Sequence, residues 1–184
     1  MSLQAIIYMI IYLQSSASMH SCYSYISIAI SVSLQMGLHR SAASKNLDPV
    51  QQETRKRIFW VIRIMETYVT TLLGLPTMLS DEDIDQEMPS CTDDNNSTVD
   101  GVLPMESHAT STIAALNAHI TLIGIMRNVL HEVYPRAKQL GSKTTEPYRV
   151  SHTRVIKIER ELDRWFQNIP APTPTEALQP GVLR

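Results

Sequence analysis

The strongest constraint on the fold is the spacing of apolar residues in three long segments. They recur at intervals of three and four residues, with one doubled interval of seven in the second segment, close to the α-helical period of about 3.6. The first segment carries Ile58, Ile62, Met65, Val69 and Leu72. The second carries Ile113, Leu116, Ile120, Ile123, Leu130 and Val133. The third carries Val155, Ile158, Leu162, Trp165 and Ile169. No window alternates with period two over the length of a strand, so the sequence predicts an all-α, multi-helix domain.

Residues that favour helix ends flank the first of these segments. Asp48 is a good N-cap, Pro49 suits the first helical position, and Gln51 stands three residues beyond the cap, where a capping box needs it. Gly74 and Pro76 follow the last apolar position. The sequence therefore predicts a helix that begins at Pro49 and ends before Gly74.

The beginning of the chain carries no formal charge before Arg40. Its apolar run, Ala5 to Leu13, is about nine residues long, well below the roughly 20 that span a membrane. We expect helices packed between other helices, the second over about 20–36 and closed by a left-handed Gly37. A membrane-associated protein held by this uncharged segment is the alternative. Since no charge precedes the apolar run, a secretory signal is disfavoured.

Composition excludes several classes of function. The 184 residues suit one domain, and a hydrophobic share of 43% supports a buried core. A net charge of −2 provides no overall attraction to nucleic acid or anionic membrane. The two cysteines, Cys22 and Cys91, are too few for a disulfide framework or a four-cysteine metal site. The six glycines are too widely spaced for a phosphate-binding loop.

Two stretches of the chain lack a helical pattern. Residues from about 89 to 104 are rich in Ser, Thr, Asp and Asn, which is typical of a surface loop. Residues 171–184 form a proline-rich tail that we expect to be disordered. The predicted domain therefore covers residues 1–170.

Candidate metal sites fail on their spacing. Asp81, Asp83 and Asp85 match the first positions of a calcium loop, but Gln86 stands where the loop needs glycine and Thr92 where it needs glutamate. These carboxylates are therefore interpreted as an acidic surface turn.

Catalytic motifs fail as well. His131 and Glu132 resemble the start of a zinc-protease motif, but Pro135 occupies the position of the second histidine. No serine lies in a Gly-x-Ser-x-Gly elbow. We expect no enzyme activity, no cofactor and no metal in this chain.

A short basic run, Arg55 to Arg57, offers a contact for phosphate. Three adjacent helical residues fan over most of a turn, however, so they cannot form one flat patch. A solvated face with ion pairs is the favoured interpretation, and Glu53, four residues before Arg57, is the expected partner of that arginine.

Three segments in one order resemble the regulatory domain, or middle homology region, of fungal zinc-cluster transcription factors of the xylanolytic-activator type. They are GLHR at Gly37–Arg40, LDPVQQETRKRIFW at Leu47–Trp60 and LLGLPTMLSDEDIDQEMP at Leu72–Pro89. The chain departs from the family pattern at Met36, Lys56 and Leu75. A later stretch, Leu162–Pro170, also resembles a helix of that domain. The positions that carry the resemblance are Gly37, Leu38, His39, Arg40, Arg55, Arg57, Trp60, Gly74, Pro76, Asp83, Asp85 and Pro89.

The resemblance implies a nuclear, all-helical regulatory module that modulates transcription by RNA polymerase II. Family members bind DNA through a separate module in which six cysteines hold two zinc ions, and two cysteines cannot supply that set. We therefore expect a fragment that lacks the zinc-cluster module and contacts DNA only indirectly. The expected partners are other parts of a transcription factor or co-regulators, a small-molecule effector and a second copy of the chain.

The residues that carry the resemblance are expected to position helices rather than to touch a ligand. If the Trp60 indole is buried, its replacement by alanine should cost about 3–5 kcal/mol.

Overall fold

The computed structural model describes residues 2–91, 97–98, 101–102, 112–134 and 150–170. This described part is all-α, as predicted. Its elements are α1 (Leu3–Ser15), α2 (Met19–Gln35), the 3₁₀ helix η1 (Ser41–Ser44), α3 (Pro49–Leu73), the 3₁₀ helix η2 (Asp81–Asp83), the two-residue strands β1 (Ser97–Thr98) and β2 (Gly101–Val102), α4 (Thr112–Val133) and α5 (His152–Gln167). The two strands pair antiparallel, with Ser97 opposite Val102.

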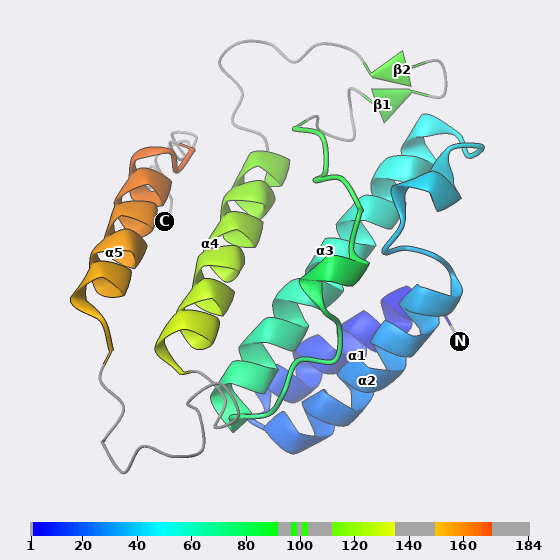
Figure 1. The fold of residues 1–184 in the computed structure, drawn as a ribbon. Helices are drawn as coiled ribbons and strands as arrows, with labels where there is room; N and C mark the ends of the chain where they lie inside the picture. The colour runs from blue at the N-terminus through cyan, green and yellow to red at the C-terminus, as the bar shows by residue number, and fades with distance from the viewer. Residues whose placement is uncertain (1, 92–96, 99–100, 103–111, 135–149, 171–184) are drawn as a thin grey trace, which may run out of the picture.

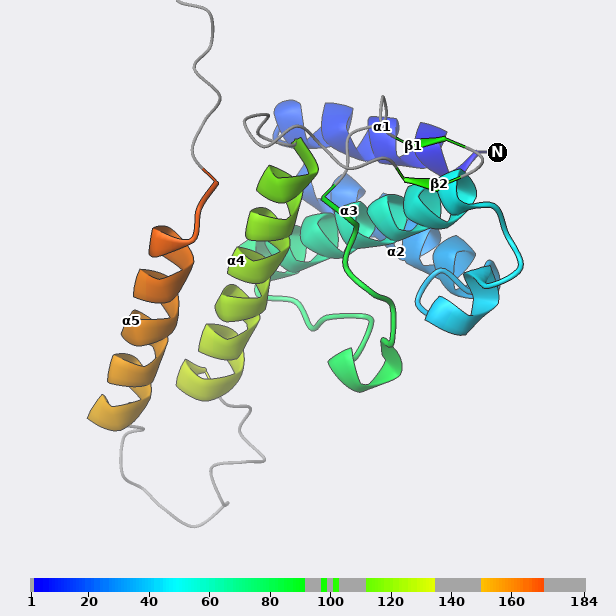
Figure 2. The same cartoon turned by 90° about the horizontal axis from the view of Figure 1, so that it is seen from above.

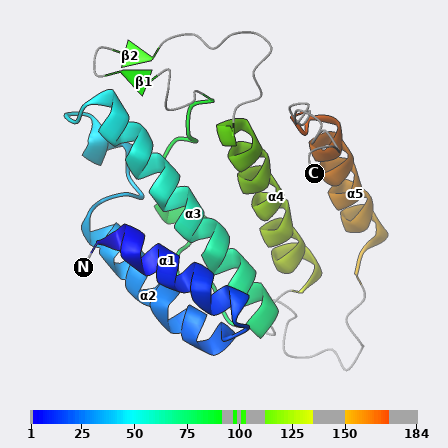
Figure 3. The ribbon, with the colours of Figure 1, turned by 180° about the vertical axis from the view of Figure 1, so that it is seen from behind.

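The long helix α3 lies at the centre of the helix arrangement (Figure 1). Helices α1 and α2 form an antiparallel hairpin, and α2 packs on one side of α3, as the view from behind shows (Figure 3). Helix α4 packs on the other side of α3, and α5 runs antiparallel to α4 on its outer side (Figure 2). The order of packing is therefore α1, α2, α3, α4 and α5.

The helix ends follow the predicted signals, with one difference. Asp48 Oδ1 accepts a hydrogen bond from the Gln51 amide at 2.8 Å, and Pro49 is the first residue of α3. The side chain that turns back at this end belongs to Gln52, whose Nε2 donates to the Leu47 carbonyl at 2.7 Å. The capping box predicted for Gln51 is therefore only partly right: its amide bonds Asp48 as expected, but the side chain that returns to the backbone belongs to Gln52.

Two glycines close α2 and α3 in the left-handed conformation. Gly37 has φ +69° and Gly74 has φ +65°. After Gly37 the Leu38 amide donates to the Ser33 carbonyl at 2.9 Å, and after Gly74 the Leu75 amide donates to the Thr70 carbonyl at 2.8 Å. Both ends are Schellman motifs, which satisfy carbonyls that the helix would leave unpaired.

The main core lies between α1, α2 and α3. Its fully buried members include Ile10, Ile26, Leu38, Phe59 and Val69. A smaller cluster joins α3 to α4 and consists of Ile64, Ile120 and Ile123.

The expectation that α1 packs between other helices is only half right. Leu3, Ile6, Ile7 and Ile10 are buried, but Tyr8 and Tyr12 are 72% and 66% exposed. The reason is geometric, since α2 covers one face of α1 and no other described helix covers the opposite face.

By length and composition alone, α4 is the one described helix that could cross a membrane. In the structure it packs between α3 and α5, and the Trp165 indole of α5 donates to its Ala118 carbonyl at 2.7 Å. Helix α1, which the alternative interpretation treated as a membrane anchor, has 13 residues. The predicted loop over residues 92–96, 99–100 and 103–104 and the predicted disordered tail at 171–184 lie outside the described residues.

Candidate functional site

A segment after α3 folds back along that helix and binds it through a series of polar contacts. Residues 78–90, called the strap, run antiparallel to α3 (Figure 1). Beside its apolar stripe, α3 presents to the strap a second series of side chains, spaced three, four, three and three residues apart. This polar seam consists of Glu53, Lys56, Trp60, Arg63 and Glu66.

At one end of the seam, two charged side chains are buried against the start of the strap. Glu66 is fully buried, and its Oε1 accepts the amides of Met78 at 2.6 Å and Leu79 at 3.2 Å. Its Oε2 is paired with Arg63 Nη1, and Arg63 Nη2 donates to Asp81 Oδ1 at 3.0 Å. Buried charges are tolerated when they are paired and hydrogen-bonded in this way, so these contacts fix where the strap begins.

At the other end, an ion pair and an indole hold the strap. Lys56 Nζ lies 3.1 Å from Glu53 Oε1 and 3.0 Å from Glu87 Oε2. The second oxygen of Glu53 accepts the Ser90 amide at 2.9 Å, and the Trp60 indole donates to the Glu87 carbonyl at 2.9 Å.

These contacts shift two pKa values. Burial alone would raise the pKa of Glu53, but the Ser90 amide and Lys56 outweigh it, so the pKa is lowered. Burial alone would lower the pKa of Lys56, but the two glutamates raise it overall. Both groups are therefore held in their charged forms.

The middle of the strap binds the segment that follows α2. The Asp85 amide donates to the His39 carbonyl at 3.1 Å, and Asp85 Oδ1 accepts the Ser41 amide at 2.9 Å. The buried Gln86 side chain donates to the Leu38 carbonyl at 2.7 Å. A half-exposed ion pair joins Arg40 to Asp85 at 3.6 Å. The strap thus ties the end of α2 to α3.

The basic run divides between separate partners. Arg55 Nη2 donates to the Met36 carbonyl at 2.6 Å and its Nε to Ser44 Oγ at 3.0 Å, so it caps the end of α2. Lys56 joins the polar seam. The predicted pair of Glu53 with Arg57 is wrong, because Lys56 and the Ser90 amide occupy the Glu53 carboxylate.

The structure brings most of the family-type positions to the strap or to its supports. Leu38, His39, Arg40, Asp85 and Trp60 contact it directly or belong to it, while Gly37 and Arg55 shape the segment that it binds. Pro89 is buried, and its carbonyl accepts Asn117 Nδ2 of α4 at 2.8 Å.

Four further positions take no part in those contacts. Gly74 closes α3 and Pro76 is exposed in the turn that follows. Asp83 is exposed, and its side chain makes no hydrogen bond or ion pair among the described residues. Arg57 is half-buried on α3.

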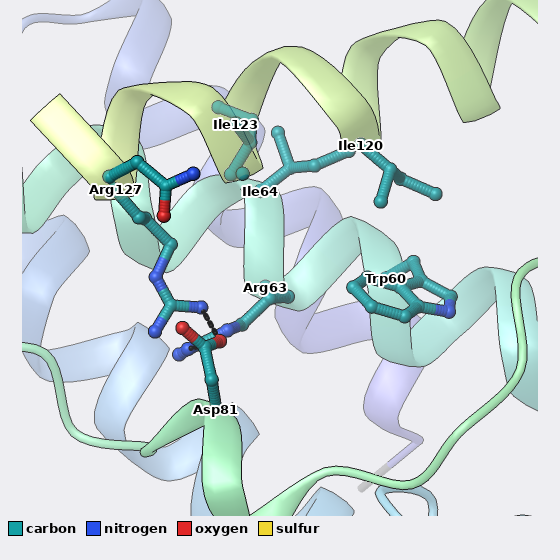
Figure 4. A pocket seen from close by; sticks show the side chains of 9 residues that line it. Trp60, Arg63, Ile64, Asp81, Ile120, Ile123 and Arg127 are labelled. Carbon is teal, nitrogen blue, oxygen red and sulfur yellow. Dashed lines mark hydrogen bonds and ion pairs between the residues drawn. The ribbon is translucent and has the colours of Figure 1, made fainter. Parts of the chain in front are cut away.

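A cavity of about 290 Å³ opens between α3, α4 and η2 (Figure 4). Its apolar side chains are Trp60, Ile64, Ile120 and Ile123. Its charged side chains are Arg63, Arg127 and Asp81, and Figure 4 shows both arginines directed at the Asp81 carboxylate. Asp81 Oδ1 is paired with Arg127 Nη1 as well as with Arg63. An apolar space with a few converging charges is typical of a small-molecule site.

A second cavity of about 430 Å³ lies between α3, α4 and the turn after α1. It is lined mainly by apolar side chains, among them Met65, Leu72 and Leu116, and by Gln14 and His119, with no acidic residue, lysine or arginine. It therefore has few polar groups that could select one ligand over another.

Sequence reasoning missed Arg63, Glu66 and Arg127. The signal was present, because Arg63 and Glu66 each follow an apolar-stripe residue, Ile62 and Met65, by one position. Charged residues at such positions lie at the edge of a buried helix face and require partners there.

The family model described as "Fungal specific transcription factor domain" matches residues 1–167. "Activator of stress genes protein 1" of Candida albicans is 36% identical over 92% of this chain and 18% of its own length. "Activator of stress genes 1" of Saccharomyces cerevisiae is 34% identical over 92% of this chain and 17% of its own. "Transcriptional activator protein acu-15" of Neurospora crassa is 32% identical, with shares of 92% and 18%.

The chain thus spans less than a fifth of the length of these relatives. No solved structure matches.

Proposed function

Because the chain belongs to the family of fungal specific transcription factor domains, we propose that it is a non-catalytic regulatory module that acts in the nucleus. It contacts other parts of a transcription factor or co-regulators and affects transcription through them. The family match over residues 1–167 carries this proposal, and relatives named as transcriptional activators support it. The resemblance stated from the sequence is confirmed, and membrane association is not supported.

The internal contacts of the charged residues support an indirect relation to DNA. Arg55, Lys56 and Arg63 all bind groups of the chain itself rather than lying free on one face. Cys22 is fully buried in the core, which argues against its use as a metal ligand. Reading bases and holding zinc are assigned to a separate module, as in family members.

The outer face of α1 is the surface best suited to contacts with other parts of a transcription factor. Tyr8, Met9, Ile11 and Tyr12 are between 43% and 72% exposed, with no charged residue among them or around them in α1. Exposed apolar patches of this kind mark interaction surfaces. The same patch could join two copies of the chain, and sedimentation of the purified chain would distinguish a dimer from a contact with other regions.

A tethering experiment tests the proposed function. The chain is fused to an unrelated DNA-binding module, and transcription of a reporter carrying that module's site is measured. We expect transcription to differ from that with the module alone. The control is Leu38→Asp, which places a charge in the core and should abolish the effect. An unchanged reporter, with the fusion folded and present in the nucleus, would contradict the proposal.

Titration against duplex DNA tests the indirect relation to DNA. At physiological salt the chain should form no sequence-selective complex. A tight complex that distinguishes sequences would overturn the assignment of base reading to another module.

A further inference from the structure

We propose that the cavity between α3 and α4 binds a small carboxylate with an apolar body, and that the Asp81 side chain occupies the position of the ligand's carboxylate in the structure described here. The proposal starts from the three charged groups at the cavity. Arg63 and Arg127 are 2% and 15% exposed at their side chains, whereas Asp81 is 69% exposed. Two largely buried guanidiniums thus meet a carboxylate that comes from the solvent side.

A ligand carboxylate can replace the Asp81 carboxylate at the two arginines. Both arginines bind the same oxygen, Oδ1, and Oδ2 has no partner among the described residues. Because Asp81 is exposed, water and other anions compete with its carboxylate for the two guanidiniums. A ligand carboxylate could offer each guanidinium its own oxygen, which is the geometry that arginine favours.

Counting charges selects a monoanion. Glu66 stays in place, since its Oε1 accepts two strap amides and its Oε2 binds Arg63. With Asp81 turned out to solvent, Arg63 keeps the carboxylate of Glu66, and Arg127 has no carboxylate among its described ion pairs. One positive charge is left over, and one carboxylate neutralises it.

The remaining walls define the body of the ligand. Trp60, Ile64, Ile120 and Ile123 are apolar, so they favour an aliphatic or aromatic group beside the carboxylate. The volume of about 290 Å³ is at the lower limit of the roughly 300–1,000 Å³ typical of ligand sites. The ligand class is therefore a small organic acid rather than a nucleotide or a peptide.

Displacement of Asp81 links the cavity to the strap. Asp81 is the first residue of η2 and lies two residues after Leu79, whose amide binds Glu66. A ligand that replaces Asp81 removes one of the contacts that hold the strap on α3. That this loosening changes transcription rests on the proposed regulatory function, whereas the binding itself does not.

The test is a titration of the full 184-residue chain with 3-phenylpropionate, using 3-phenylpropanamide as the matched uncharged probe. The indole N–H resonances of Trp60 and Trp165 are followed by NMR, since only Trp60 lines the cavity. We expect the acid to shift the Trp60 resonance and the amide to bind at least about tenfold more weakly, because it cannot pair with the guanidiniums.

Two variants and one control separate the proposal from general charge effects. Asp81→Asn should bind the acid roughly three- to tenfold more tightly, because the competing carboxylate is gone. Arg127→Gln, which leaves the Arg63–Glu66 pair intact, should weaken binding at least about tenfold. Asp83→Asn changes the net charge equally in the same 3₁₀ helix and should bind like the parent chain.

Absence of acid binding in both the parent chain and Asp81→Asn would overturn the proposal. Equal affinity for acid and amide, or an equal gain in Asp83→Asn, would overturn it as well. Acid binding that appears only in Asp81→Asn would support it. Binding as expected with an unresponsive reporter would contradict the proposed function instead, so the two failures are distinguishable.

Discussion

Single residues of α3 serve two different environments on neighbouring faces of one helix. Ile62, Met65 and Val69 lie in the core. Arg63, which follows Ile62, and Glu66, which follows Met65, bind the strap. The buried charges are stable only because each has a partner supplied by the folded chain. Removing one member of a buried pair should therefore lower the free energy of unfolding more than removing an exposed charge, because the remaining partner is left buried and unpaired.

Glu53→Gln should make stability less dependent on pH in the acid range. Because the pKa of Glu53 is lowered by folding, its contribution is present above the ordinary glutamate pKa of about 4.3 and is lost as pH falls through the folded value. At pH 7 the variant should be less stable by about 1–3 kcal/mol, and the difference should shrink below about pH 4. Urea unfolding across pH 3 to 8 measures this, and a constant difference would contradict it.

Phe59→Ala should destabilise the domain more than Trp60→Ala. Phe59 is 2% exposed in the main core, so its loss should cost about 3–5 kcal/mol. Trp60 is only half-buried, so the same range, expected from the sequence for a buried indole, is too high; we expect about 2–3 kcal/mol, including the lost bond to the Glu87 carbonyl. Denaturant unfolding of both variants gives the order, and the reverse order would contradict the burial described.

Gly37→Ala should cost more than Gly74→Ala. Both residues have a left-handed backbone, where a Cβ costs about 1–2 kcal/mol. At Gly37 the added Cβ would also lie 3.0 Å from the Ala43 Cβ, whereas at Gly74 it meets no atom within 4 Å. Thermal unfolding of the two variants tests this, and equal losses would show that Ala43 moves away freely.

At the scale of elements, the strap connects α3, the segment after α2, and α4. It touches α3 along much of that helix, binds the segment after α2, and meets α4 through the Pro89 carbonyl. The strap has only a three-residue 3₁₀ helix of its own, so side chains of other elements satisfy much of its backbone.

Gln86→Ala should loosen the strap locally. The variant leaves the Leu38 carbonyl without the donor that it has at 2.7 Å, at a cost of about 1–3 kcal/mol. The neighbouring Asp85 amide, which donates to the His39 carbonyl, should then exchange its hydrogen faster. Glu82→Ala, at an exposed position of η2, is the control and should leave that exchange rate unchanged.

The sequence predicted elements better than it predicted their contacts. Local signals such as Asp48 with Pro49, and Gly37, correctly marked helix ends, because their effect depends on neighbours in the chain. The partner of Glu53 was predicted wrongly. One of its carboxylate oxygens accepts the amide of Ser90, which lies 37 residues away, and no local pattern in the sequence indicates such a contact. Asp81 was assigned to a solvated acidic turn for the same reason, since Arg127 comes from a distant helix.

At the scale of the whole molecule, the helices form two groups that meet at α3. The α1–α2 hairpin and α3 share the main core, and α4 joins α3 through a small apolar cluster and the Asp81 ion pairs. The contact between α3 and α4 is thus smaller than the main core, and it borders the proposed ligand cavity. A regulatory module benefits from one firm core and one adjustable contact.

The strap is the feature on which the candidate site and the ligand proposal both depend. Hydrogen exchange at the amides of Met78, Leu79, Asp85 and Ser90 measures it directly, because each donates to a group outside the strap. We predict exchange at least about a thousandfold slower than in an unstructured peptide, as for amides that open only with about 4 kcal/mol or more. Exchange at these amides as fast as in an unstructured peptide, while α3 stays protected, would contradict a strap fixed on α3.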